Sequence, residues 1–356
     1  MIDDYKQILL RIATAESFGS GFYLRKYNLV VTSEHIIRGS LNVVIHNEII
    51  DKQLANVVYT DQISDIALLR PKVELKIPNC QLSIANDIGQ DVYSMAYPIR
   101  KGLVSAQGKI KSIAETFHGI EHIEHTAILG NEANGTPLFD NSGNVLGLNS
   151  FVRTKKGVRG IALPMDNILE CIRDYQNSNA TIAAKCSNCR KTIGGINIHN
   201  CTNCGVSILM PDNVEVYEPA GVCKTIEDLL SSMGYSLELA RIGPDHWELL
   251  RGSALIDISY YQKNGLIIGD AYMCKIPPQS NGKLYEYLLR LNQKLENLTF
   301  SIREDDIILS LLVYDRYLNE ETGIRLLTNL LDTADHFDNI LVNDYGCLWT
   351  NSRKLI

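Results

Sequence analysis

Short apolar runs separated by turn residues fill the first half of the chain. They cover residues 18–33, 41–50, 55–60, 66–70, 91–98, 104–113, 122–129, 144–152 and 160–164. Runs of this length, rich in Val, Ile, Tyr and Phe, are typical of an antiparallel barrel or sandwich. At 166–178 the apolar positions change to helical spacing behind an acidic start, which predicts a closing helix. We therefore expect one all-β domain over residues 1–178.

The pattern after residue 220 mixes helical and strand periods. Helical spacing covers 224–235, 282–298 and 319–337, and strand-like runs cover 236–243, 246–252, 254–263, 265–275 and a hairpin at 300–315. Asn319 stands directly before the last helix and has a side chain suited to an N-cap. This order predicts an α+β domain over residues 220–350. A chain of 356 residues is too long for one ordinary core, which agrees with several domains.

Residues 184–208 form a short cysteine-rich segment between these regions. Four cysteines stand in a C-x2-C-x11-C-x2-C arrangement: Cys186, Cys189, Cys201 and Cys204. Two such knuckles bring four thiolates to one tetrahedral ion, usually zinc, and a segment of about 25 residues needs that coordination to hold a fold. We expect a zinc ribbon with one structural Zn²⁺. Two disulfides, an iron–sulfur site, or His199 as a substitute ligand are the alternatives.

Composition and charge narrow the class of partner. The chain is 45% hydrophobic and 21% charged, as in soluble globular proteins. Its net charge of -7 arises from residues 218–356, which hold 13 basic against 20 acidic side chains. Nucleic-acid binding needs clustered Lys and Arg, so we expect a protein or peptide partner and no nucleic acid. Without an 18-residue apolar run or a secretion signal, and with nine cysteines, we expect no membrane partner and a cytoplasmic location.

Several motifs in residues 17–175 occur in the order found in one protease family. They are GSGFYL, NLVVTSEHII, TDQISDIALLR, GQDVYSMAYPIRKG, GTPLFDNSGNVLGLNS and GVRGIALPMDNI. This region resembles the trypsin-like serine proteases, most closely the bacterial Deg (high-temperature-requirement) branch. The resemblance implies a double β-barrel of the chymotrypsin fold, with His35 as general base and Asp65 as its orienting carboxylate. A serine hydroxyl attacks a carbonyl only when such a pair takes its proton.

The nucleophile loop departs from the family pattern G-x-S-G-G-P-L. Asn134 stands at the serine position, and Glu132 stands where the family has the glycine whose N–H donates to the oxyanion. The resemblance assigns the oxyanion and pocket positions to Glu132, Ala133, Gly135 and Ile128, with Ile128 near the floor of the primary pocket. A carboxamide has no hydroxyl for a histidine to deprotonate, so acyl transfer is not expected. Thr136 carries the nearest other hydroxyl, two residues late.

The element order after residue 220 is similar to a second known fold. Together with LYEYLLRLNQKLENLTFSIREDDIILSLLVYD, it resembles the type III secretion chaperone-like fold of YbjN-like bacterial proteins. The resemblance implies binding of protein segments and a homo-oligomer formed through this domain. A generic α+β domain without a partner is the alternative.

These features predict a multidomain trypsin-like protease homologue that is catalytically silent as written. Such a pseudoprotease would bind peptide in its former substrate groove and recruit a partner through the ribbon and tail. One alternative is an active Deg-like serine endopeptidase whose catalytic serine has been replaced by Asn134 through an engineered substitution. Another is a scaffold with a closed groove. Whether the protein is an enzyme depends on which of these holds.

Overall fold

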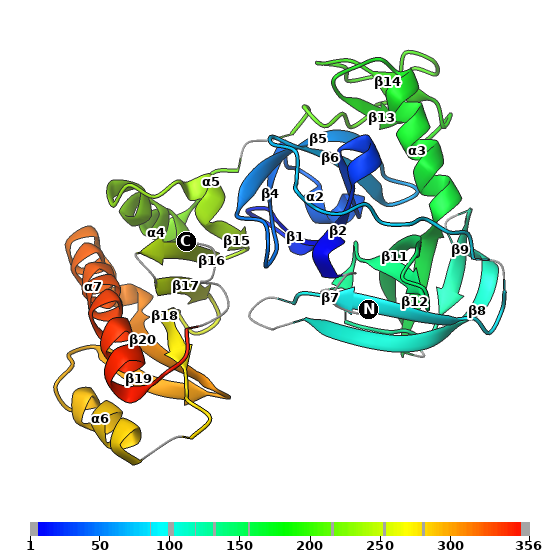
Figure 1. Ribbon diagram of the computed structural model, residues 1–356. Helices are drawn as coiled ribbons and strands as arrows, with labels where there is room; N and C mark the ends of the chain where they lie inside the picture. Colours follow the sequence, from blue (N-terminus) through cyan, green and yellow to red (C-terminus); the bar gives the residue numbers. More distant parts are fainter. Residues whose placement is uncertain are drawn as a thin grey trace. The chain divides into compact units, whose positions relative to one another are not determined.

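The computed structural model of the protein describes residues 6–85, 87–98, 103–117, 119–130, 133–155, 157–214, 217–251, 254–279 and 282–349. The chain divides into two compact units, Met1–Val216 and Tyr217–Ile356, which are taken separately below (Figure 1). Within those described ranges, none of the helices combines the length and the apolar character needed to span a bilayer.

Six antiparallel strands close into a barrel at the start of the first unit. They are β1 (Leu9–Ala13), β2 (Phe18–Leu24), β3 (Leu29–Thr32), β4 (Asn42–His46), β5 (Gln53–Asp61) and β6 (Ile66–Pro71). Their order is β5-β4-β1-β2-β3-β6, and the pairing of β6 with β5 closes the ring. Two 3₁₀ turns, η1 (Lys6–Ile8) and η2 (Arg25–Tyr27), and the one-turn helix α2 (Glu34–Ile37) connect the strands.

A second barrel follows, and one helix packs against it. Its strands are β7 (Asp91–Ala96), β8 (Val104–Phe117), β9 (Ile120–His125), β10 (Pro137–Asp140), β11 (Val145–Thr154) and β12 (Gly157–Pro164), closed in the order β10-β11-β12-β9-β8-β7. Helix α3 (Met165–Asn177) leaves β12 and runs alongside toward the cysteine-rich segment (Figure 1). This double barrel confirms the trypsin-like architecture predicted from the motifs.

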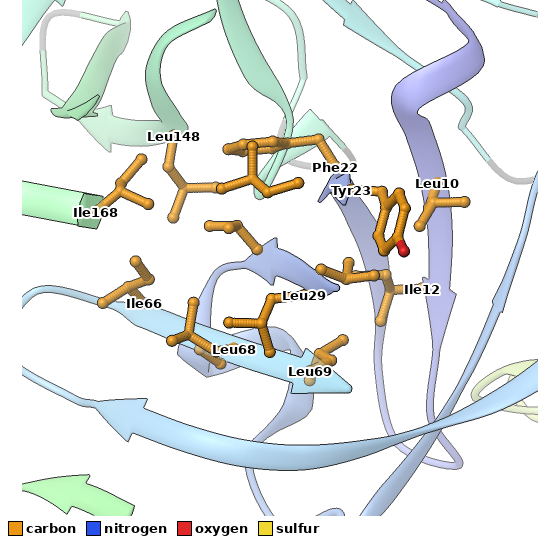
Figure 2. Packing of buried hydrophobic residues seen from close by; sticks show 14 of the residues in the cluster. Leu10, Ile12, Phe22, Tyr23, Leu29, Ile66, Leu68, Leu69, Leu148 and Ile168 are labelled. Atoms are coloured by element: carbon orange, nitrogen blue, oxygen red, sulfur yellow. The ribbon is translucent and has the colours of Figure 1, made fainter. Parts of the chain in front are cut away.

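The core of the first barrel also holds the two barrels together. Leu148 of β11 and Ile168 of α3 belong to the same buried cluster as Ile12, Phe22 and Leu68 from the first barrel (Figure 2). All five side chains are buried. Burying an aliphatic or aromatic side chain of this size contributes about 1.5–3 kcal/mol. The interface between the barrels, where a protease of this fold carries its site, is therefore packed from both sides.

The cysteine-rich segment is built onto the first barrel. It begins with the hairpin of β13 (Ala183–Lys185) and β14 (Thr192–Gly194), and β13 continues the sheet by pairing in parallel with Tyr59 and Thr60 of β5. The Lys185 ammonium lies 2.9 Å from Asp174 and 3.2 Å from Glu170, both on α3. The segment is thus fixed to both a strand and a helix of the first unit.

The second unit is one antiparallel sheet with helices. Its strands are β15 (Arg241–Gly243), β16 (His246–Arg251), β17 (Ala254–Tyr261), β18 (Leu266–Lys275), β19 (Leu298–Arg303) and β20 (Asp306–Tyr314), in the order β15-β16-β17-β18-β20-β19. The helical elements are α4 (Gly221–Ser232), α5 (Leu237–Ala240), α6 (Gly282–Asn292), η4 (Asp315–Tyr317) and α7 (Glu320–Tyr345). Helix α7 packs on β17, β18 and β20, and α6 packs on β19. This is an α+β arrangement.

Three element boundaries in the second unit bear on the predictions. Asn319 caps α7 as predicted, because its side chain accepts a hydrogen bond from the Thr322 N–H at 2.9 Å. The predicted strand 236–243 is wrong in its first half, where the helix-favouring run LELA forms α5. The predicted helix 282–298 ends at Asn292, whose side chain bonds the backbone N–H and C=O of Phe300.

Candidate active site

The predicted base and carboxylate lie on neighbouring turns of the first barrel. His35 stands in the first turn of α2, and Asp65 ends the turn between β5 and β6 with a left-handed φ of 49°. The His35 backbone N–H donates to Asp65 Oδ1 at 2.9 Å, and its ring Nδ1 lies 2.7 Å from Oδ2. Because the carboxylate accepts at Nδ1, neutral His35 carries its proton there. Nε2 is then the acceptor, as a general base requires.

Asn134 lies before β10, on the second barrel, and reaches across to His35. Its Oδ1 accepts a hydrogen bond from the Phe151 N–H at 2.7 Å, and its Nδ2 lies 3.2 Å from His35 Nε2. The Phe151 N–H must face an oxygen, so it fixes the orientation of the amide. The Asn134 NH₂ therefore donates to His35 Nε2. The lone pair with which His35 would take a proton is engaged by this carboxamide.

The backbone around Asn134 is held by both barrels. The Asn134 carbonyl accepts from the Ser20 N–H at 3.1 Å, and the Gly135 N–H donates to the Asn149 carbonyl at 3.0 Å. Gly135 has φ +84°, and a Cβ there would lie 2.1 Å from the Ser20 carbonyl oxygen. A glycine is required at this point because any side chain would be strained and would collide with β2.

A groove opens beside these three side chains. Its volume is about 420 Å³, and His35, Asp65 and Asn134 line one part of it. Much of the remaining wall is apolar and comes from β11 and β12: Leu148, Phe151, Val152, Ile161 and Leu163. Polar and charged side chains complete the lining: Arg38, Gln62, Ser64, His122, Ser150 and Arg153. A concave site that combines an apolar wall with convergent polar groups can bind a ligand.

The other predicted site residues have different positions. Ala133 is buried, with its N–H donating to the Gly130 carbonyl at 2.9 Å. Ile128 is 39% exposed and lies outside the described lining of the groove. Glu132 lies outside the described residues, so its oxyanion role stays a prediction. The Thr136 hydroxyl is buried and donates to the Ala133 carbonyl at 2.8 Å.

Sequence reasoning missed the groups that hold Asn134 in place. The partners of its side chain and carbonyl are the backbone N–H groups of Phe151 and Ser20. Backbone groups leave no residue-type signal in a sequence. They could be found only by pairing the strands first.

The four cysteines of the ribbon segment converge on one point. All four Sγ atoms lie within 4.8 Å of one another, with Cys186–Cys204 at 3.7 Å and Cys189–Cys201 at 3.6 Å. These separations are far beyond the roughly 2.05 Å of a disulfide. Tetrahedral bonds of about 2.3 Å from a metal to sulfur place neighbouring sulfurs about 3.8 Å apart. The cluster is compatible with a metal site, and exposed His199 is not part of it.

Backbone dipoles around the cluster favour thiolates. The Val206 backbone N–H, followed by Asn188, lowers the pKa of Cys204 to about 6, and the backbone of Lys191 lowers the pKa of Cys189. Burial raises the pKa of Cys201 to about 11. A cation bound among the sulfurs would compensate for that burial, because metal ligation requires thiolates.

Comparison with known proteins finds similarity to serine proteases. The trypsin-like peptidase domain matches residues 19–148. A probable periplasmic DegP-like serine endoprotease of Hahella chejuensis is 26% identical over 178 residues, 47% of this chain and 37% of that protein. The chloroplastic protease Do-like 1 of Arabidopsis thaliana is 31% identical over 165 residues, 42% of this chain and 37% of that protein. The chain thus spans little more than a third of the length of either relative.

A likeness to solved structures covers about half of the chain. The serine endoprotease from Yersinia pestis is 17% identical with a TM-score of 0.45, covering 50% of this chain and 68% of that one. The domain match and the curated relatives together identify residues 19–148 as a trypsin-like peptidase domain homologous to the HtrA- and DegP-type serine proteases.

Proposed function

We propose that the trypsin-like domain is catalytically silent and binds peptide segments in the groove beside His35. The carrying observation is the Asn134 carboxamide, which bridges the Phe151 N–H and His35 Nε2. A carboxamide offers no O–H to deprotonate, and its nitrogen lone pair is delocalised, so it does not attack a peptide carbonyl. The same amide forms hydrogen bonds with a polar group on each barrel. It can therefore keep the site ordered although it cannot act as a nucleophile.

The groove itself supports the binding part of the proposal. Its apolar wall would accept an apolar side chain, and its polar lining residues, among them His35, Arg38 and Asp65, could hydrogen-bond a peptide. A peptide bound there would meet an ordered surface, because the adjoining loop is hydrogen-bonded to strands of both barrels.

Activity-based labelling tests the silence directly. A fluorophosphonate probe should leave the native chain unlabelled, whereas Asn134→Ser restores a hydroxyl 3 Å or so from Nε2 and should label. Asn134→Ser combined with His35→Ala is the matched control and should not label. Labelling of the native chain would overturn the proposal. If Asn134→Ser fails while an HtrA-type protease labels in parallel, the oxyanion side of the loop is also lost.

A second function is favoured by the intact His35–Asp65 pair. Its geometry is that of a working protease, which supports an active Deg-like serine endopeptidase whose serine has been replaced by Asn134 in this chain. A serine codon at this position in the native gene would establish that alternative. An asparagine codon in the native gene would contradict that alternative and favour the catalytically silent domain.

Peptide binding has its own test. Fluorescein-labelled β-casein, an unfolded protein with many apolar side chains, should bind the native chain in an anisotropy titration. Val152→Asp puts a carboxylate into the groove wall and should weaken binding at least tenfold, since a bound apolar side chain would have to displace its hydrating water. Val73→Asp makes the same change at a side chain that is 67% exposed and should leave binding unchanged. Absence of any binding would favour the closed scaffold.

We further propose that the cysteine cluster holds one structural Zn²⁺. Sulfur-only ligation and the separations of the four Sγ atoms suit zinc, and four protein ligands leave no open position for catalysis. Zinc would supply fold stability to residues 184–208. Elemental analysis should find one zinc ion per chain. We also propose a reducing, cytoplasmic location, supported by nine cysteines of which none is in a disulfide, and testable with a membrane-impermeant maleimide on intact cells.

For the second unit we propose a YbjN-like, partner-binding domain that recruits protein and can form a homo-oligomer. The α+β element order supports it, as do large apolar side chains left exposed on its strands, including Leu250 at 56% and Leu312 at 54%. Light scattering of the full chain tests the oligomer. Leu312→Glu should reduce the observed mass if β20 contributes to the contact, and a monomer at all concentrations would contradict self-association.

A further inference from the structure

One arginine of the cysteine segment reaches into the first barrel. Arg190, directly after Cys189, forms a forked pair with Asp61, with nitrogen–oxygen distances of 2.8 and 2.6 Å. The same guanidinium lies 3.1 Å from the Ser64 hydroxyl. Asp61 is fully buried. Burial alone would raise the pKa of Asp61, yet the Arg190 and Ser64 hydrogen bonds lower it, so the pair is charged on both sides.

Asp61 in turn builds the turn that carries Asp65. Its Oδ1 accepts from the backbone N–H groups of Ile63 and Ser64 at 3.1 and 3.3 Å, and its Oδ2 accepts from the Ser64 hydroxyl at 2.7 Å. This cap fixes the path of the chain from β5 to Asp65, which sits at a strained positive φ. Residues 62–65 all line the groove.

The position of Arg190 depends on the first cysteine knuckle. Its own φ is +59°, and its N–H donates to the Cys186 carbonyl at 3.0 Å, while the Cys186 N–H donates to the Lys191 carbonyl at 2.9 Å. This tight loop carries two of the four thiols. Metal ligation would therefore fix the backbone from which the Arg190 side chain extends.

The rest of the segment is anchored independently. Strand β13 pairs with β5, and Lys185 pairs with Glu170 and Asp174 of α3. Loss of metal would thus loosen the knuckle without detaching the segment. Loosening the knuckle would change the conformation around Asp61. A buried carboxylate that loses its only described arginine partner is strongly destabilised, so it must move toward water or take up a proton.

We propose that Arg190 is a positioning residue that couples metal binding at the four cysteines to the geometry of His35 and Asp65, so that metal occupancy orders or loosens the peptide groove. The proposal rests on the metal site and the peptide groove proposed above. The route runs from the knuckle through Arg190 and Asp61 to the turn that ends at Asp65. A metal chelator, or oxidation of the thiols, would then alter the groove from a distance.

The test follows the His35 Nδ1–H proton by NMR in the full chain labelled with ¹⁵N-histidine and assigned with His35→Gln. In the zinc-loaded chain its hydrogen bond to Asp65 should give a low-field resonance that exchanges slowly with water. Removing zinc with EDTA should speed that exchange at least tenfold or abolish the resonance. Arg190→Gln should do the same while still binding cobalt, as seen in its thiolate absorption, and EDTA should then add no further change.

Lys191→Gln is the matched control, since it removes a charge from the same knuckle beyond the Asp61 pair. It should retain both the resonance and its response to EDTA. The coupling is overturned if the zinc-loaded chain lacks the resonance, if EDTA leaves the wild-type signal unchanged, if the chain binds no metal, or if metal-bound Arg190→Gln keeps the signal. Should Arg190→Gln fail to fold, Arg190→Lys, which loses the fork but keeps the charge, is judged by the same outcomes.

This readout requires no peptide, so the two proposals can fail separately. A normal His35 response with no casein binding contradicts only the groove function. Casein binding that is indifferent to zinc, together with an unchanged His35 signal, contradicts only the coupling.

Discussion

The cysteine cluster is assembled within one short segment, residues 186–204, whereas the His35–Asp65–Asn134 site joins residues up to 99 positions apart, and the two sites should tolerate substitution differently. The cluster keeps all four sulfurs within 4.8 Å. The other site has an amide where related serine proteases have a hydroxyl, and the side chain of Asn134 is hydrogen-bonded at both its oxygen and its nitrogen. A metal centre needs every ligand to hold its ion, whereas a hydrogen-bonded site needs only groups that satisfy one another. A hydrogen-bonded site can therefore keep its geometry when one of its side chains is replaced, whereas a metal centre cannot.

The largest expected effect comes from breaking the cysteine cluster. Cys201→Ser replaces a buried thiol with a poorer ligand, so the proposed zinc should be lost, together with much of the roughly 10–16 kcal/mol by which such an ion stabilises a small segment. Zinc content should fall from one per chain to near zero, and limited proteolysis should cut the segment. Cys80→Ser lies outside the cluster and should keep its zinc. Retention of zinc by Cys201→Ser would show that three thiols suffice.

A smaller effect should follow from straining the loop that carries Asn134. Gly135→Ala imposes a side chain at φ +84° and brings Cβ to 2.1 Å from the Ser20 carbonyl, so the first unit should lose about 3 kcal/mol of unfolding free energy. Urea denaturation measures this loss. Gly130→Ala, five residues earlier, meets nothing within 4 Å and should cost little. Equal stability of the two variants would mean that the two barrels do not clamp this loop as described.

Motifs predicted the side chains of both sites but not what supports them. His35, Asp65 and the four cysteines could be found because their chemistry needs particular residue types at particular spacings. Phe151 could not, because it contributes a backbone N–H, and its position depends on the register of β11. Arg190 could not, because its partner Asp61 lies 129 residues away and only the pairing of β13 with β5 brings them together.

For secondary structure too, local patterns predicted the elements, whereas some of their boundaries depended on contacts between them. Alternating apolar runs predicted the strands of the barrels, since burial decides those positions. The strand predicted for 236–243 is wrong at Leu237–Ala240, because the run LELA favours a helix, which begins directly after Ser236. The end of α6 depended on the side chain of Asn292 binding Phe300, a contact across a turn that no periodicity encodes.

The pH response of the first unit should come from the second barrel. His125, on β9, is buried against the Phe151 ring, and burial lowers its pKa to about 4. In the unfolded chain its pKa is near 6.5, so below that pH the unfolded state takes up a proton that the folded state refuses. Stability is therefore complete above pH 6.5 and should fall by about 2 kcal/mol by pH 5.

Urea denaturation at pH 7 and pH 5 checks this expectation. His125→Gln should flatten the difference between the two pH values, whatever its effect on stability at pH 7. His199→Gln removes an exposed histidine and should leave the pH dependence as it is. An unchanged slope in His125→Gln would assign the response to another group.

The smallest expected effect follows from removing the Asn134 carboxamide. This substitution compares the His35–Asp65–Asn134 site with the cysteine cluster most directly. Asn134→Ala deletes one member of its site, as Cys201→Ser does, but leaves only the Phe151 N–H and His35 Nε2 to find water beside an open groove. The cost should be about 1 kcal/mol in urea denaturation, the net value of a hydrogen bond that solvent can replace. Fluorophosphonate should not label this variant, since no nucleophile is gained. A loss of stability comparable with that of Cys201→Ser would mean that the Asn134 side chain is essential for holding the two barrels together. Asparagine at this position would then be explained by stability and not by a loss of catalysis.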